Sequence, residues 1–357
     1  RRRDHRAAHV RGQPFRGDPQ GAAQTLMPID VHAHYVPLKL LDVLEREGAR
    51  YGVNVVEHQP TCQKCLRFEY GLQIRPFFPK LVEPVASRIE SMQRCGIDRQ
   101  VLSAWADIFG YALARDKGEA WHRLLNDLLA DFSASNSKSF SWLASGALPD
   151  AARAARELER AVKAGAVGGV LATNVEGTNL GELPLDEYWA AAVALDVPVF
   201  LHPAQPVPLP RSGKFALNQI AQYTFDTTLC VGSLISSGVL DRFPKLRLIL
   251  SHGGGALPYL IGRFDVMHER ADKAQGIVAA AKPSSYLRRM WYDTILHDAT
   301  ALRYLAGRVK ADRIVLGSDD SFPPADRDPL ASLRAAGFDA SEMKLITEDN
   351  PRQLFRL

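Results

Sequence analysis

The 357-residue sequence lacks several features that would each place it in a special class of protein. No apolar run approaches the about 18 residues of a membrane-spanning helix, so we expect no membrane span. Four Cys residues are too few for the disulfide framework of a small secreted protein. Cys62 and Cys65 form a lone CxxC without the second pair of a zinc ribbon. We therefore expect a protein of the reducing cytoplasm.

An excess of positive charge is missing from most of the chain. The formal net charge is +4, and residues 1–26 alone carry six Arg against two Asp. The rest of the chain is neutral, which argues against partners such as nucleic acid or an anionic membrane. Residues 1–26 have no apolar period, and no apolar segment follows Arg1–Arg3 as an export signal requires. We interpret them as a disordered leader or artificial extension before a domain at 27–357.

Eight apolar, β-rich runs alternate with stretches of helical periodicity from Met27 onward. Parallel strands that are buried on both faces lose the apolar–polar alternation, and a helix after each strand is typical of a (β/α)8 barrel. A doubly wound open sheet usually has a Gly-rich turn after its first strand, where this chain has His32-Ala33-His34. We therefore predict an α/β TIM barrel with strands at 28–35, 99–105, 140–148, 167–173, 197–202, 246–252, 290–296 and 313–318.

The helical periodicity and its stop signals predict the remaining elements. Residues 39–80 do not fit the alternation, because they contain three Pro and only short mixed runs. We interpret them as an insertion of small strands and loops that lies over the barrel mouth. The predicted helices are 84–94, 119–134, 150–165, 186–195, 227–242, 257–269 and 299–307.

Four of the ten His residues and one Asp fall where predicted strands end. His32 and His34 end the first strand, His202 the fifth and His252 the sixth, and Asp319 follows the eighth. In a barrel these ends converge on the face that carries active sites, and residues two apart on a strand share a side. Imidazoles with a carboxylate are typical ligands of Zn²⁺ with an open position for water. The sequence therefore predicts a metal centre.

Two absences narrow the kind of metal enzyme. The fourth predicted strand ends Ala172-Thr173-Asn174, without a Lys that could be carbamylated to bridge two metals, which favours one metal per chain. The residues after His202 are Pro203-Ala204-Gln205. Purine and pyrimidine deaminases of this barrel type use a Glu there for acid–base chemistry on the ring nitrogen of the substrate, so its absence argues against a deaminase.

The motifs at these positions are similar to those of the amidohydrolase superfamily. They resemble most the branch of 2-amino-3-carboxymuconate-6-semialdehyde decarboxylase and related metal-dependent decarboxylases, over about residues 28–357. The most specific parts are the His-x-His pair and the His-Gly-Gly-Gly run at 252–255 with its following Gly262-Arg263. The other matching segments are 29–34, 109–111, 201–203, 241–246, 262–265, 316–319 and 350–355.

The resemblance implies a role for each matching residue. His252 would activate a metal-bound water, and Arg75 would bind a carboxylate of the substrate. Arg263 would reach the site of the other subunit in a homodimer, and Phe215 would form an aromatic wall of the pocket. The metal ligands, to one Zn²⁺ per chain or another divalent ion, would be His32, His34, His202 and Asp319.

Some positions depart from the family pattern. Related decarboxylases of aromatic acids often have Glu where this chain has His32, which favours the semialdehyde-decarboxylase side of the branch. Ala204 and the segment 320–323 replace aromatic residues that commonly line the pocket. These departures leave the native substrate open.

The leading hypothesis is a non-oxidative C–C lyase that acts on an unsaturated or aromatic carboxylic acid. Zinc lowers the pKa of bound water toward about 7, and a neighbouring His can complete the proton transfer. A hydrolase of a lactone, amide or ester, or a hydratase, would use the same centre. A catalytically silent, metal-stabilised binding scaffold is a third hypothesis. Two cationic residues, Arg75 and Arg263, favour the lyase over the hydrolase, because they suit a dicarboxylate substrate and a neutral lactone does not need them.

Overall fold

The computed structural model describes residues 26–357 except residues 60, 205 and 271–275. The predicted leader at 1–26 therefore lies outside the described residues, apart from Leu26.

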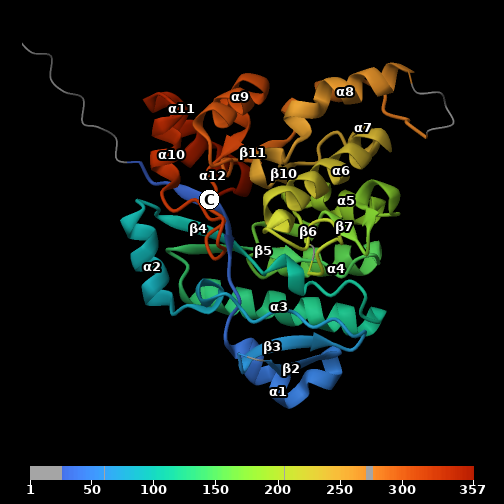
Figure 1. Ribbon diagram of the computed structural model, residues 1–357, viewed down its shortest axis with the longest axis vertical. Helices are drawn as coiled ribbons and strands as arrows, with labels where there is room; N and C mark the ends of the chain where they lie inside the picture. The colour runs from blue at the N-terminus through green and yellow to red at the C-terminus, as the bar shows by residue number, and fades with distance from the viewer. Residues whose placement is uncertain (1–25, 60, 205, 271–275) are drawn as a thin grey trace, which may run out of the picture.

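Eight parallel strands form one sheet that curves into a barrel (Figure 1), which confirms the predicted fold class. The last strand returns to the first, where Val31 N donates to Leu316 O at 2.9 Å and Asp319 N donates to His32 O at 2.8 Å. In sheet order the strands are β1 (Ile29–His34), β4 (Arg99–Ser103), β5 (Phe140–Ser145), β6 (Gly168–Ala172), β9 (Val199–His202), β10 (Leu248–Leu250), β11 (Trp291–Asp293) and β12 (Ile314–Val315).

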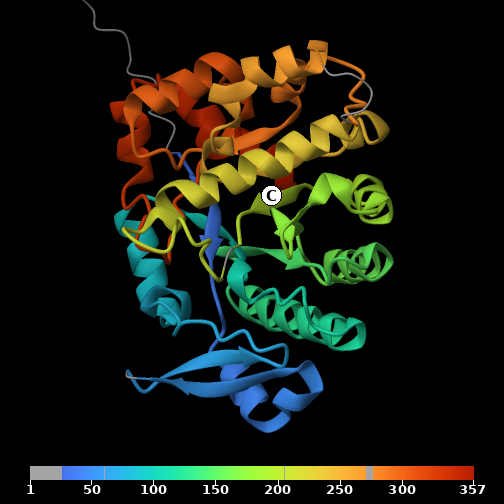
Figure 2. The same ribbon diagram turned by 45° about the vertical axis from the view of Figure 1, so that its right-hand side comes forward.

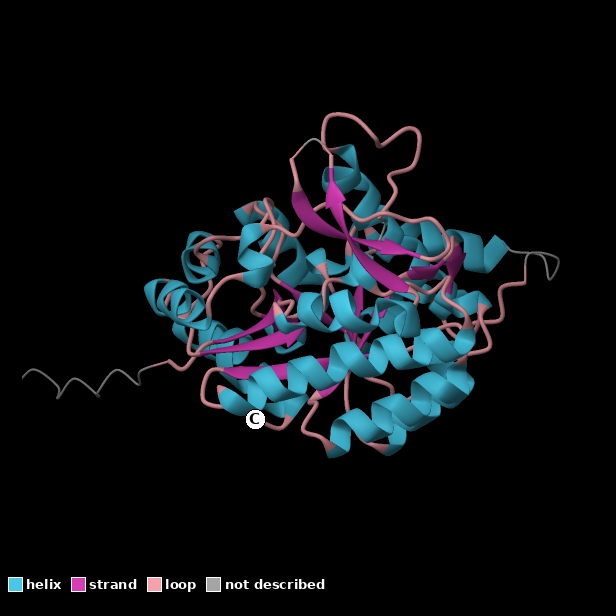
Figure 3. Cartoon of the chain, turned by 90° about the horizontal axis from the view of Figure 1, so that it is seen from below, coloured by secondary structure: helices cyan, strands magenta, loops and turns pink. Residues whose placement is uncertain are grey.

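The strands are buried on both faces. Every residue of β1, β5 and β6 is buried, which explains why their sequences show no alternation of apolar and polar residues. Figure 3 shows most strands, in magenta, inside a layer of helices in cyan. The carboxyl ends of β1 and β9 each finish in a buried His, so the barrel itself places these imidazoles.

The helices follow the strands and cover the barrel (Figure 2). The helix predicted at 227–242 is two helices, because Gly238 lies between them with a φ of 71°. The helices are α1 (Lys39–Tyr51), α2 (Val85–Arg94), α3 (Arg115–Ser135), α4 (Ala151–Lys163), α5 (Asp186–Ala194), α6 (Tyr223–Ser236), α7 (Val239–Arg242), α8 (Leu257–Arg270), α9 (Ala299–Val309), α10 (Pro329–Ala335), α11 (Ala340–Lys344) and α12 (Asn350–Phe355).

The insertion at 39–80 contains the predicted small strands and loops, but it also contains a helix that was not predicted. It begins with the 13-residue helix α1, whose buried residues Leu40, Leu44 and Tyr51 lie on one face. An antiparallel hairpin follows, β2 (Val53–His58) and β3 (Gln63–Phe68). Helix α1 contacts α3, and Figures 1 and 2 show α1 and the β2–β3 hairpin together at one end of the molecule, beyond α3. The chain after β3 is the part of the insertion that lines the cavities at the barrel mouth.

A second small hairpin, β7 (Asn174–Val175) and β8 (Thr178–Asn179), follows β6 at the carboxyl end of that barrel strand. In the part of the chain that the structure describes, no helix is long and apolar enough to cross a membrane.

Candidate metal centre and active-site cavity

Four imidazoles and one carboxylate meet at the carboxyl end of the barrel. The Nε2 atoms of His32 and His34 lie 3.0 Å apart, and each lies within 3.3 Å of Asp319 Oδ1. The His202 ring centroid lies 4.9 Å from that of His32, and His252 Nε2 lies 3.5 Å from Asp319 Oδ2. The structure therefore brings together all five residues that the sequence singled out.

Three of the imidazoles are oriented by hydrogen bonds on their far sides. His32 Nδ1 donates to Asp293 Oδ2 at 2.7 Å, and His202 Nδ1 donates to the carbonyl of Pro203 at 2.7 Å. His34 Nδ1 lies 3.0 Å from Ser103 Oγ. A neutral imidazole that donates through Nδ1 presents a lone pair at Nε2, which is the arrangement of metal-ligating His residues.

The donor atoms at the centre of the cluster fit a divalent cation. His202 Nε2 is buried and lacks a hydrogen-bond partner among the described residues, and burial of such a group without a partner costs free energy. One ligand atom from each of His32, His202, His252 and Asp319 lies within 4.8 Å of the others. Imidazole nitrogens with a carboxylate oxygen suit Zn²⁺ and neighbouring first-row metals.

The electrostatics of the cluster also favour positive charge. Burial lowers the pKa of His32, but the carboxylates of Asp319 and Asp293 outweigh it and raise this pKa to about 10. Burial raises the pKa of Asp319, but the charge of His32 and the surrounding imidazoles hold it well below its usual range. Burial lowers the pKa values of His34 and His202, which favours the neutral imidazoles that metal ligation requires.

The loops that carry His252 and Asp319 have unusual backbone conformations. Both residues have a positive φ, 53° and 55°, which is uncommon for residues with a Cβ atom. Asp293 stabilises the first loop, because its carboxylate accepts the backbone N–H groups of His252 at 2.9 Å and Gly253 at 2.8 Å. A Cβ atom on Gly255 would overlap the carbonyl of Thr224, so this position requires glycine. Such strain is typical of functional sites.

A cavity of about 420 Å³ opens beside the cluster. His202, His252 and Asp319 form its floor, and Arg75 lies in its wall. The Arg75 guanidinium lies 4.2 Å from the ring centroid of Phe78 and 5.6 Å from that of Trp105, so cation–π contacts hold its charge at the cavity. Further walls come from Asp107, Tyr223, Ile295, His297 and Phe322.

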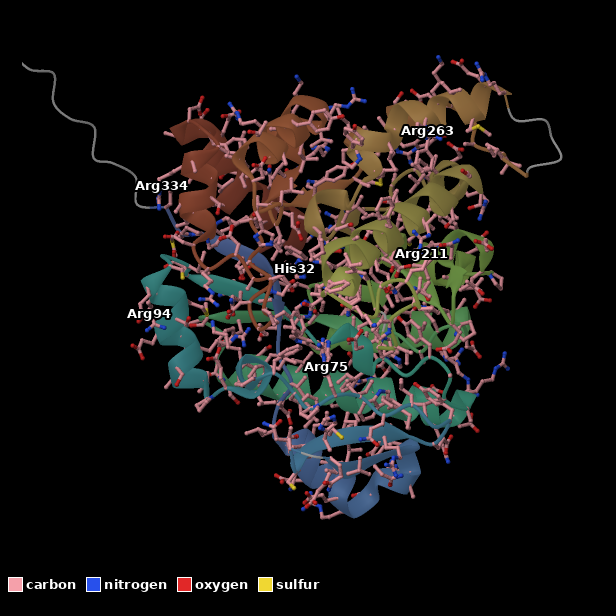
Figure 4. All side chains as sticks on the ribbon, viewed as in Figure 1. His32, Arg75, Arg94, Arg211, Arg263 and Arg334 are labelled. Atoms are coloured by element: carbon pink, nitrogen blue, oxygen red, sulfur yellow. The ribbon has the colours of Figure 1, made fainter. Side chains whose placement is uncertain are left out.

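Two predicted site residues lie elsewhere. Phe215 is 85% exposed and is absent from the cavity lining, so it forms no wall of the pocket in this structure. Its φ is 58°, in the loop before α6. Trp105, Tyr223 and Phe322 supply the aromatic wall instead. Arg263 is exposed on α8, and Figure 4 shows it far from His32 and Arg75.

Sequence reasoning missed Asp293, which orients His32 and holds the His252 loop. Its signal was an Asp in the middle of the apolar run 290–296, where the observed strand β11 ends. It also missed Asp107 and Tyr223, for which the chain offers no comparable pattern.

Comparisons with known proteins agree with this architecture. The amidohydrolase family model matches residues 29–357. The 2-amino-3-carboxymuconate-6-semialdehyde decarboxylase of Dictyostelium discoideum is 29% identical over 299 residues, which are 83% of this chain and 82% of that enzyme. A gamma-resorcylate decarboxylase from Polaromonas sp. (strain JS666) is 26% identical, over 78% of this chain and 89% of its own.

Solved structures show the same fold. The 5-carboxyvanillate decarboxylase of Sphingomonas paucimobilis superposes with a TM-score of 0.77 at 24% identity, over 93% of this chain and 99% of that one. A dihydroxybenzoic acid decarboxylase from Polaromonas sp. JS666, with bound manganese and 2-nitroresorcinol, superposes with a TM-score of 0.75 at 24% identity, over 93% and 97%. This chain belongs to the amidohydrolase family, in its branch of metal-dependent decarboxylases.

Proposed function

We propose that the protein is a zinc-dependent, non-oxidative decarboxylase of an unsaturated or aromatic carboxylic acid. The observation that carries the proposal is the convergence of oriented imidazoles and a buried carboxylate beside a cavity that also holds Arg75. The relatives above are decarboxylases of carboxylated aromatic or muconate compounds. Manganese is bound in several solved neighbours, but the nitrogen-rich donor set of this chain favours zinc.

In this proposal His32, His34, His202 and Asp319 hold the metal. A divalent ion held there would supply Lewis acidity toward an oxygen of the substrate. Asp293, Ser103 and the Pro203 carbonyl keep the imidazoles in the orientation that ligation requires.

Arg75 binds and orients the carboxylic acid in the cavity. The decarboxylation breaks the bond between the substrate carbon and its carboxylate, and the electron pair stays on that carbon, which then takes a proton. We assign the exchange of this proton to His252, and the position of its ring in the cavity lining next to Asp319 supports the assignment. The products are CO₂ and the substrate carbon skeleton with hydrogen in place of the carboxylate.

The proposal includes a homodimer in which Arg263 of one subunit reaches the site of the other. Arg263 is exposed and lies apart from its own cavity. Large exposed apolar side chains lie on the neighbouring surfaces of α6 and α8, including Phe225, Leu229 and Tyr259. Exposed apolar surface of this kind is typical of a protein–protein contact.

A substrate panel tests the reaction class. Carboxylated muconate semialdehydes, hydroxybenzoates and nitrogen-heterocycle acids are incubated with zinc-loaded and chelator-treated protein, and CO₂ is measured. We expect zinc-dependent CO₂ release from at least one compound, and Arg75→Ala to raise KM and lower kcat together. Opening of lactones or amides without CO₂ release from any acid would contradict the proposal in favour of a hydrolase.

Elemental analysis tests the metal. We expect about one zinc ion per chain, because the described ligands form one cluster and no Lys bridges it. His202→Ala should lose both metal and activity. Two metal ions per chain, or manganese as the metal that supports activity, would overturn this part of the proposal.

Subunit mixing tests the role of Arg263. Inactive Arg263→Ala and His252→Ala proteins are mixed under conditions of confirmed subunit exchange, and activity is measured. A mixed dimer has one site with an intact His252 and an intact Arg263, so we expect partial recovery. Without recovery, Arg263 does not act across subunits.

A further inference from the structure

The segment that carries Asp319 has a strained backbone. Asp319 and Ser321 have φ angles of 55° and 125°, which residues with a Cβ atom rarely adopt. Strand β12 ends before this segment, so the regular sheet does not extend to it. Asp319 N donates to His32 O at 2.8 Å, but the hydrogen bond from His34 N to Asp320 O is long at 3.3 Å. Strain of this kind persists only where the surrounding structure fixes it.

The side chain of Arg88 joins this segment to the carboxyl end of β1. Arg88 lies on α2 and is fully buried. Its Nη2 donates to the carbonyl of His34 at 2.9 Å, and the same carbonyl accepts from Ser321 Oγ at 2.8 Å. Ser321 Oγ and Asp320 Oδ2 lie 3.5 and 3.7 Å from Nη2. One guanidinium nitrogen therefore contacts the last residue of β1 and the two residues that follow Asp319.

A chain of hydrogen bonds also links Arg88 to the residue before Asp319. Arg88 Nε donates to Gln100 Oε1 at 2.9 Å, and Gln100 Nε2 donates to Asp30 Oδ2 at 3.0 Å. The carboxylate of Asp30 accepts the Ser318 hydroxyl at 2.6 Å and the Ser318 backbone N–H at 3.0 Å. These side chains are all buried. Arg88 is thus connected, directly or through two other side chains, to the residues on both sides of Asp319.

The charge of Arg88 is costly to bury, which indicates a role beyond packing. Burial lowers the pKa of Arg88, although the carboxylates of Asp320 and Glu83 oppose this shift. An apolar side chain of similar volume often stabilises a protein as well as a buried charge does. It lacks, however, the planar fork of N–H donors that Arg provides. The described lining of the active-site cavity does not include Arg88, so this residue acts through its neighbours and not on a substrate.

We propose that Arg88 is a positioning residue of the metal centre, which holds the Asp319 carboxylate in place relative to the imidazoles of β1. This inference rests on the proposed function, because it takes Asp319, His32 and His34 as metal ligands. It adds that the geometry of the ligand set depends on a charged side chain of α2 that contacts neither metal nor substrate. Loss of this side chain should relax the segment 319–321 and change both the affinity for the metal and its geometry.

Metal binding tests the inference without requiring turnover. Competition with a chromophoric chelator measures zinc affinity, and the visible absorption of the Co²⁺-loaded protein reports the ligand geometry. We expect Arg88→Met to lower zinc affinity by about 10- to 100-fold, the usual effect of losing a contact that orients the ligands, and to shift the Co²⁺ absorption bands. Arg88→Lys keeps the charge but lacks the planar fork, so we expect an intermediate loss.

Matched variants separate positioning from stability. Arg94→Met removes an exposed Arg from the same helix, which Figure 4 shows at the edge of the molecule, and should bind both metals like the wild type. Ser321→Ala removes one of the two donors to the His34 carbonyl and should lower zinc affinity by a smaller factor than Arg88→Met. Circular dichroism and urea denaturation of the metal-free proteins show whether each variant is folded. If neither Arg88 variant folds, wild-type zinc affinity in Ser321→Ala overturns the proposal.

The outcomes separate the inference from the proposed function. If folded Arg88 variants bind zinc and absorb with Co²⁺ as the wild type does, the role of Arg88 is wrong and the proposed function stands. If the wild type binds no metal and no acid of the substrate panel loses CO₂, the proposed function fails and the inference fails with it. Metal binding that depends on Arg88, without CO₂ release from any acid, supports the inference and contradicts the decarboxylase.

Discussion

Asp293 connects the metal cluster to the loop that carries His252. Its Oδ2 accepts from His32 Nδ1 at 2.7 Å and from the His252 backbone at 2.9 Å. We predict that Asp293→Asn lowers zinc affinity by about 10- to 100-fold, the usual effect of removing a hydrogen-bond partner of a ligand. Competition with a chromophoric chelator measures this affinity, and Asp42→Asn on the outside of α1 is the control. Unchanged affinity would mean that other contacts orient His32.

His252 is expected to act on protons rather than to be needed for metal binding. We predict that His252→Gln keeps about one zinc per chain while turnover falls by about 10²- to 10⁴-fold, as for loss of a general acid or base. Elemental analysis and steady-state kinetics on the same preparation give both quantities. Because His252 lies within the ligand cluster, loss of zinc in this variant would assign it to the metal instead.

The positions of the central residues could be predicted because each follows from a strand pattern. His32, His34 and His202 lie within β1 and β9, and Asp319 follows β12. Phe215 belongs to no strand pattern. It lies in a loop, and the path of a loop depends on contacts that hydrophobic periodicity does not indicate. Asp293 was missed for a different reason. It lies within a predicted strand, but a single Asp in an apolar run does not by itself indicate a functional residue.

The loop between β10 and α8 depends on a glycine that local backbone geometry requires. Gly255 has a φ of 63°, and a Cβ atom there would overlap the Thr224 carbonyl. We predict that Gly255→Ala lowers the free energy of unfolding by about 1–3 kcal/mol. Gly307→Ala in α9 has open space and a helical backbone, and should stabilise the protein by up to about 1 kcal/mol. Urea denaturation compares the two, and equal effects would contradict the prediction.

Helix α3 and strand β5 enclose a buried His that makes stability depend on pH. His122 Nδ1 lies 2.8 Å from Ser145 Oγ, and burial lowers the pKa of His122 to about 3. The unfolded chain binds this proton near pH 6.5 and the folded chain does not, so stability falls as pH drops below about 6.5.

The magnitude of this dependence can be measured. Between pH 6.5 and 5 the contribution of His122 amounts to about 2 kcal/mol. We predict that the difference in unfolding free energy between the wild type and His122→Gln shrinks by about this amount over the same range. Urea midpoints at several pH values give the difference. A constant difference would show that His122 does not titrate on unfolding.

The elements of the barrel were more predictable than those of the insertion. Buried parallel strands are apolar throughout, so all eight could be located, although β10, β11 and β12 are shorter than their apolar runs. Helix α1 was missed because the prolines of the insertion dominated its interpretation. They all follow the hairpin strand β2, and the Leu40–Leu44 spacing alone indicates a helical face.

At the scale of the whole molecule, the proposed metal bridges the two ends of the barrel sheet. His32 and His34 belong to β1, and Asp319 follows β12, where few backbone hydrogen bonds close the barrel. We predict that a chelator lowers Tm and increases amide exchange in β1 and β12 more than in β6, which lies opposite β12 in the barrel. Hydrogen-exchange mass spectrometry measures this, and a uniform increase would contradict the bridging role.

This ligand arrangement has a consequence for biosynthesis. During translation His32 and His34 leave the ribosome early, but Asp319 emerges only after most of the chain has been made. A nascent chain therefore carries the early part of the site for a long time without its carboxylate. If the metal is held by the proposed ligands, we expect the full ligand set to form only after Asp319 has been made, which would couple loading of the metal to completion of the polypeptide.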